Sequence, residues 1–160
     1  MLDNKNFNQF DYLVQTVPQL LNSLRNSNND SSLLMRTARY GKQDAFSKLL
    51  EYPQDISIVD IAGENVFHYV SCYRNVEWWL DELKKNVNDD NKLKELLDRK
   101  DNYRGGETSL HCAASRNNHQ VIKWLLLNGA DVNATNKWGE LADVCGYGET
   151  KKMIREHRDK

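Results

Sequence analysis

Cysteine and histidine are the residue types in this chain best suited to chemistry, because both can bind metals or take part in proton transfer and nucleophilic attack. The cysteines are Cys72, Cys112 and Cys145, an odd number, and no pair has the C-x-x-C spacing typical of zinc or redox sites. Reduced thiols in an intracellular compartment therefore fit best. No serine or cysteine can be paired with a base on sequence grounds, and there is no Gly-rich phosphate loop. We expect no catalytic residue, no metal and no cofactor.

The balance of charges disfavours two further classes of partner. The 160 residues have a net charge of -1, which gives no long-range field to attract the phosphates of a nucleic acid. No apolar run approaches the ~20 residues that span a bilayer, and the N-terminus has no apolar signal core. We therefore expect no nucleic acid and no membrane as partner, and a location in the cytoplasm or the nucleus.

Residues of the same type recur along the chain at a fixed offset, which is the mark of a repeat architecture. Gly106 and Gly139 lie 33 residues apart, and the same spacing joins Leu34 to Phe67. The clearest repeat runs over residues 106–137. It predicts a first helix, a turn, a second helix with an apolar stripe, and a terminating glycine, built from Thr108, Leu110, Ala113, Ala114, Asn117, Val121, Ile122, Leu125, Leu126 and Gly129. One such unit cannot bury its apolar face without a stacked neighbour.

Two motifs in this unit resemble the ankyrin repeats. Residues Thr108 to His111 are similar to the family's T-P-L-H signature, with Ser109 in place of proline. Residues Gly129 to Ala134 match its G-A-D-V-N-A motif. The resemblance implies an all-α solenoid of helix-turn-helix repeats with short β-hairpin loops, and covers about residues 30–155.

The resemblance divides the chain into a cap and about four repeats. Residues 1–29 are expected to form an N-terminal helical cap, followed by repeats at 30–62, 63–105, 106–138 and 139–160, the last a degenerate cap. The second repeat is about ten residues too long, with the excess in a polar insertion at 86–104. Leu93, Leu96 and Leu97 suggest an extra helical turn there. We expect the insertion to project from the stack and to tolerate a ten-residue deletion.

The family also suggests structural roles for several reactive side chains. His68 and His111 occupy the signature position, where the imidazole hydrogen-bonds the backbone of the inter-repeat loop. Cys112 and Cys145 are expected to pack between repeats and Cys72 to be more exposed. One of Trp78 and Trp79 should be core. The basic residues that end the chain are expected to be a solvated helix end, with anion binding as the alternative.

By resemblance, the function is recognition of a partner protein on the concave face, which is built from loop tips and first helices. The partner-facing positions of the family, carried over repeat by repeat, are Arg39, Tyr40, Ile61, Glu64, Cys72, Tyr73, Arg104, Glu107, Ser115, Arg116, Lys137, Trp138, Glu140 and Tyr147. This set is rich in Arg, Tyr and Trp, the types that dominate interface hot spots.

Two versions of that function stay open. One is an inhibitor that occludes a partner's functional surface, as the Rel-transcription-factor inhibitors of this family do. The other is an assembly chaperone that shields a basic client, which a clearly acidic concave face would favour. A structural subunit of a larger complex is the alternative, and a large apolar patch on the convex side would support it. We expect no enzyme activity, and a monomer or a weak dimer.

Overall fold

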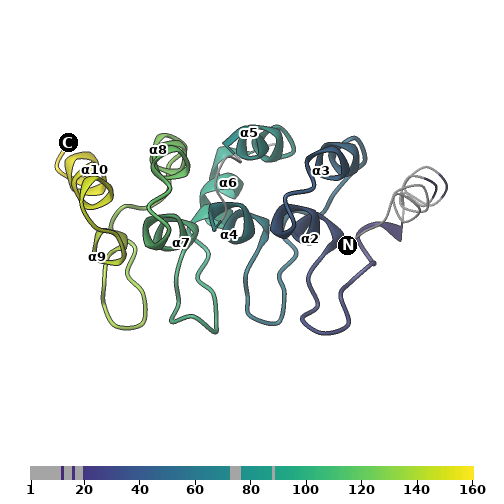
Figure 1. The fold of residues 1–160 in the computed structure, drawn as a ribbon, viewed down its shortest axis with the longest axis horizontal. Coiled ribbons are helices and arrows are strands. Elements are labelled where there is room, and N and C mark those ends of the chain that lie inside the picture. The colour runs from purple at the N-terminus through teal and green to yellow at the C-terminus, as the bar shows by residue number, and fades with distance from the viewer. Residues whose placement is uncertain (1–11, 13–15, 17–19, 73–76, 88) are drawn as a thin grey trace.

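The computed structural model describes residues 12, 16, 20–72, 77–87 and 89–160. Nine helices lie within these ranges and follow one another along the chain (Figure 1). They are α2 (Leu33–Arg39), α3 (Gln43–Leu50), α4 (Val66–Ser71), α5 (Glu77–Lys85), α6 (Asp90–Leu97), α7 (Ser109–Ser115), α8 (His119–Leu127), α9 (Ala142–Cys145) and α10 (Glu149–Arg158).

Eight of these helices form four pairs that stack side by side, and α6 packs on α4. Figure 1 shows an inner row of first helices, α2, α4, α7 and α9, beneath an outer row of α3, α5, α8 and α10. The loops between pairs hang on the opposite side from the outer row, and the stack bends in a shallow arc with the loops on its hollow side. Within the inner row α4 packs between α2 and α7, and α7 packs on α9. The predicted all-α repeat solenoid is confirmed.

The first helices begin at residues whose side chains satisfy free backbone amides. The hydroxyl of Ser32 accepts from the amide of Met35 (3.2 Å), and the side chain of Asn65 accepts from Phe67 (3.0 Å). The turn that follows α7 contains Asn117 in the left-handed region (φ 51°), as its residue type predicts. Gly41 has the same role after α2 (φ 62°). A left-handed residue in the turn lets the chain reverse within three residues after α2 and after α7.

The apolar faces of all the pairs join in one continuous core. Leu110 and Leu125, the predicted core of the third repeat, are 1% and 0% exposed. Trp79 is also core, stacked on Phe46 with 4.5 Å between ring centroids, whereas Trp78 is half-buried and meets both rings edge-on. The prediction that one tryptophan of the pair is core is confirmed.

Helix α6 corrects the expectation for the insertion. Leu93, Leu96 and Leu97 are at most 3% exposed and belong to the common core. The side-chain amide of Asn65, at the start of α4, donates to the backbone carbonyl of Leu96 (2.8 Å). The predicted extra helical segment exists, but the insertion packs its apolar face on the stack, so a ten-residue deletion here would remove core. The polar residues of α6 lie on its opposite, exposed face. Their number is the reason that the sequence predicts a projecting insertion.

The loops are joined in a row by single backbone hydrogen bonds. The amide of Ile61 donates to Asn29 (3.1 Å), that of Asn102 to Ala62 (2.7 Å), and that of Lys137 to Gly105 (2.7 Å). Each loop is closed at its base by an Asn or Asp side chain that accepts backbone amides, namely Asn26, Asp60, Asp101 and Asn136. In the described ranges the expected short β-hairpin loops appear as isolated antiparallel bridges, at Arg25–Ser32 and Thr135–Leu141.

The two ends of the stack were predicted to be caps. Most of residues 1–19 lie outside the described part of the chain, so the N-terminal cap stays a prediction. At the other end Asp143, 2% exposed, accepts from Arg155 (2.6 Å) and Arg158 (3.3 Å). These two cations therefore tie α10 to α9, and the expectation of a merely solvated helix end is wrong for them.

Candidate partner-binding face

The hollow side of the stack presents side chains from three short inner helices and four loops. We call it the concave face and define it as the C-terminal ends of α2, α4 and α7 together with the loops at 26–31, 60–64, 101–107 and 136–140. The helices are six or seven residues long, so the side chains at their ends reappear at equivalent places in each repeat. Arg39, Cys72 and Arg116 come from such ends.

A pocket of about 280 Å³ opens on the concave face where the first three repeats meet. Its lining residues are Arg39, Glu64, Tyr69, Cys72, Arg104 and Arg116. Five of the six belong to the partner-facing set predicted from the sequence. The structure thus brings together residues from three repeats, although contact with a partner stays a prediction.

Tyr69 is the lining residue that sequence reasoning missed. Its hydroxyl donates to Asp60 (2.8 Å) and accepts from the side-chain amide of Asn29 (3.1 Å), so it connects α4 to two successive loops. Burial raises its pKa, and the tyrosine stays neutral. The available signal was its helical position, three residues before the predicted Cys72. Residues at that spacing lie on the same helix face.

The three arginines of the pocket are unequally paired. The guanidinium of Arg104 lies 3.3 Å from the carboxylate of Glu64, and it donates to the sulfur of Cys72 at 3.5 Å. Arg39 and Arg116 form no ion pair with any residue in the part of the chain that the structure describes. Within the described residues, two cations at the pocket therefore have no carboxylate paired with them.

The titratable groups respond to this environment in opposite ways. Burial raises the pKa of Glu64 to about 7, against the charge of Arg104, which lowers it. The pKa of Cys72 falls to about 6, first because the thiol of Cys112 hydrogen-bonds it and then because Arg104 and Arg116 attract the thiolate, while burial opposes the shift. The pKa of Cys112 rises accordingly. The lowered pKa of Cys72 was not predicted, because its neighbours come from another repeat.

The burial of the cysteines follows the prediction in part. All three are free, with Cys112 buried and Cys72 and Cys145 both partly buried. Burial raises the pKa of Cys145 to about 11. Cys112 is thus a packing residue, whereas the expectation that Cys72 is more exposed than Cys145 stays a prediction.

His68 and His111 have the structural role that the resemblance implied. The Nδ1 atom of each ring accepts the amide of its own N-cap residue, so Nε2 carries the proton. His68 then donates to the carbonyl of Glu107 (3.2 Å), and His111 to that of Glu140 (3.1 Å). Burial lowers the pKa of His68 to about 4, so the ring is neutral at physiological pH. Across the described ranges no three His, Cys, Asp or Glu side chains group as metal ligands.

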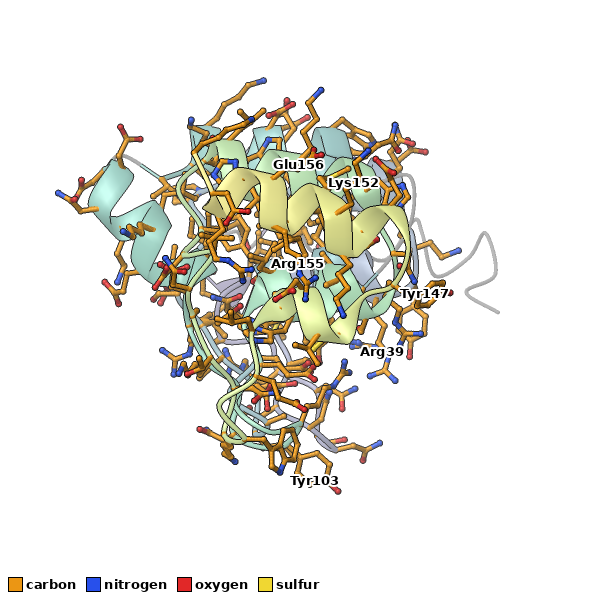
Figure 2. All side chains as sticks on the ribbon, turned by 90° about the vertical axis from the view of Figure 1, so that its left-hand side faces the viewer. Arg39, Tyr103, Tyr147, Lys152, Arg155 and Glu156 are labelled. Atoms are coloured by element: carbon orange, nitrogen blue, oxygen red, sulfur yellow. The ribbon has the colours of Figure 1, made fainter. Side chains whose placement is uncertain are left out.

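The loop tips present exposed apolar side chains. Ile61 is 70% exposed, Tyr103 87% and Trp138 67%. Figure 2 shows Tyr103 at the far end of its loop, and Arg39 and Tyr147 on one common side of the stack. Trp138 also packs on its neighbour, because a Cβ on Gly105 would lie 2.2 Å from its ring. Tyr103 was not predicted, because the third loop is two residues longer than its neighbours and the carried-over positions pass it by.

Several of the remaining predicted positions form hydrogen bonds within the protein, and others are exposed. The hydroxyl of Ser115 donates to the carbonyl of Cys112, the ammonium of Lys137 to that of Asn102, and Glu140 accepts from Asn136. Tyr40 and Tyr147 are exposed, and Glu107 is half-buried. Tyr73 lies outside the described residues.

Comparison with known proteins adds one finding. A family model described as ankyrin repeats (3 copies) matches residues 34–136, more than half of the chain. No curated protein matches the chain significantly. None of the described helices is long and apolar enough to cross a membrane.

Proposed function

The chain belongs to the ankyrin-repeat family, whose members generally mediate protein–protein interaction, and we propose that it recognises its partner protein on the concave face. The observation that carries this proposal is the row of large exposed side chains on that face. Tyr40, Tyr103 and Trp138 are between 61% and 87% exposed. Such residues bury a large area on binding and still offer a polar group, which makes them common hot spots.

The charge of the face favours one version of the function. An assembly chaperone for a basic client needs acidic side chains, but three arginines line the pocket of this face. The proposal is therefore an inhibitor that covers a functional surface of its partner, and that surface carries acidic residues. We do not extend it to a Rel-type factor, because no residue of the face is specific to one.

A structural subunit, by contrast, would need a broad apolar patch on the convex side. The described outer helices expose only isolated large apolar side chains, such as Leu127, which is 72% exposed. Single exposed leucines are normal on a soluble surface.

The test compares the two sides of the stack. A partner captured from lysate by the full chain is identified, purified and titrated against Tyr103→Ala, Trp138→Ala and Leu127→Ala. The first two remove exposed aromatic rings of the concave face, so each should raise the Kd by roughly tenfold or more. Leu127→Ala is the control for the convex side and should bind like wild type. Circular dichroism melts check that each variant is folded. If Leu127→Ala abolishes binding while both aromatic variants keep wild-type Kd, the concave face is not the binding surface.

A further inference from the structure

The pocket at the meeting point of the first three repeats has more cations than anions. Its three guanidinium groups, on Arg39, Arg104 and Arg116, come from α2, the third loop and the end of α7. The lining residues that can carry negative charge are Glu64 and Cys72. The whole chain has a net charge of -1, so this excess is a local arrangement and not a consequence of composition.

One of the three guanidinium groups, that of Arg104, already interacts with negatively charged groups of the pocket. Arg104 lies beside both Glu64 (3.3 Å) and the sulfur of Cys72 (3.5 Å). Arg39 and Arg116 remain without an ion pair in the described ranges. A guanidinium group with free N–H donors is matched in shape by a carboxylate, which it can bind through two parallel hydrogen bonds.

We propose that this pocket binds the carboxylate of an Asp or Glu side chain on the partner protein, held by Arg39 and Arg116. The inference rests on the proposed function and names the chemistry of the contact. The volume of about 280 Å³ fits one side chain and lies below the usual range of small-molecule sites. Tyr69, fixed by its hydrogen bond to Asp60, provides a neutral wall that does not compete for the arginines.

Binding to such a pocket should depend on pH. The groups that face Glu64 are Arg104, Asp60, Cys72 and Asp101, and Glu107 lies nearby with its pKa raised by burial. Glu64 has a pKa of about 7, raised by burial. Between pH 8 and pH 6 it takes up a proton and releases Arg104. Protonation of Cys72, whose pKa is about 6, also makes the pocket more positive. Both groups therefore act in the same direction, and a carboxylate binds more tightly at pH 6 than at pH 8.

The experiment titrates the isotope-labelled full chain with short glycine peptides blocked at both ends, and follows the arginine Nε–H signals by NMR. The first peptide carries one central glutamate and the second a glutamine. We expect the glutamate peptide to shift the signals of Arg39, Arg104 and Arg116, and the glutamine peptide to leave them unchanged. Arg39→Gln and Arg116→Gln should each raise the Kd by roughly tenfold. Lys123→Gln, on the exposed side of α8, removes the same charge and should have no effect.

Glu64→Gln tests the internal competitor. It should tighten binding of the glutamate peptide at pH 8 and flatten the pH dependence. Two further peptides separate the sources of an anion, one with a free C-terminus and no acidic side chain, and one with phosphoserine. The inference is overturned if the glutamine peptide shifts the signals equally, if both arginine variants keep the wild-type Kd, or if either further peptide binds more than tenfold tighter than the glutamate peptide. The proposed function is judged separately, by the response of the purified partner to Tyr103→Ala and Trp138→Ala.

Discussion

At the scale of single residues, reactivity in this protein is set by neighbours from other repeats. Cys72 ends α4, but the groups that lower its pKa, Cys112, Arg104 and Arg116, belong to the next repeat and its loop. His68 likewise donates its proton to a carbonyl of the following loop. A residue's chemistry here therefore depends on the stacking of repeats and would be lost in an isolated one.

The thiol of Cys72 should react fastest of the three under native conditions. At pH 7 most of it is thiolate, because its pKa is about 6, and it is partly exposed. Native titration with a disulfide reagent should show one fast thiol, lost in Cys72→Ser and kept in the control Cys145→Ser. The fast rate should level off above about pH 7. A fast phase that survives Cys72→Ser would contradict this assignment.

His68 should make the stability of the fold fall in mild acid. Burial lowers its pKa to about 4 from an ordinary 6.5, so between these values only the unfolded chain takes up the proton. Its stabilisation is complete above pH 6.5 and is lost as the pH falls towards 4, by up to about 1.4 kcal/mol per pH unit. The raised pKa of Glu64 makes the fold more stable as the pH falls, which is the opposite of the effect of His68. The contribution of His68 is therefore measured as the difference between wild type and a His68 variant.

Urea melts of wild type and His68→Gln at several pH values isolate the effect. The glutamine can still donate to the carbonyl of Glu107, but it does not titrate. The free energy of unfolding of wild type should approach or fall below that of the variant as the pH drops from 6.5. His119→Gln, at an exposed histidine, is the control and should run parallel to wild type. Parallel curves for wild type and His68→Gln would show that the pKa of His68 is the same in the folded and the unfolded chain.

At the scale of elements, the helices could be predicted where one repeat resembles the family and not where it departs from it. The residues 106–137 carry the helix caps, the apolar stripe and the left-handed Asn117 in their own sequence, so the third repeat was predictable. Helix α6 was predictable as a helix but not in its packing. Its three leucines fit any apolar surface, and only the position of α4 shows which surface covers them. Tyr69 and Tyr103 could not be predicted either. The rotation of α4 decides that Tyr69 reaches the concave face, and the length of the third loop decides that Tyr103 does.

Helix α6 should contribute to stability as a core element. Leu97 is fully buried, so Leu97→Ala should lower the free energy of unfolding by roughly 2–5 kcal/mol. Lys94→Ala, on the exposed side of the same helix, is the matched control and should change it little. Chemical denaturation followed by circular dichroism measures both. An unchanged midpoint for Leu97→Ala would restore the first expectation of a projecting insertion.

At the scale of the whole molecule, the repeats are connected in two different ways. The helices share one apolar core that runs through all the pairs. Neighbouring loops are linked through one backbone hydrogen bond at each junction and through side chains such as Trp138 on Gly105. A stack of this kind gains its stability mainly from contacts between adjacent repeats.

Gly105→Ala tests the contact between the third and fourth loops. Gly105 has φ 113°, and a Cβ there would lie 2.2 Å from the ring of Trp138. Gly41 is the matched control, because its φ is also positive, at 62°, but nothing lies within 4 Å of the new carbon. Both alanine variants should lower the Tm through backbone strain, and Gly105→Ala should cost roughly 1–3 kcal/mol more than Gly41→Ala. Equal losses would mean that Trp138 is free to move away.

The single hydrogen bonds between loops also set how the molecule yields to a mechanical load. The helices lie on the outer side of the arc and the loops on the hollow side (Figure 1). Straightening the arc spreads the row of loops, where the bonds from Ile61, Asn102 and Lys137 hold one junction each. Tightening the arc instead presses loop tips such as Trp138 against their neighbours. Each such bond adds only about 1 kcal/mol. A partner that flattens the curve therefore stretches these single bonds between the loops.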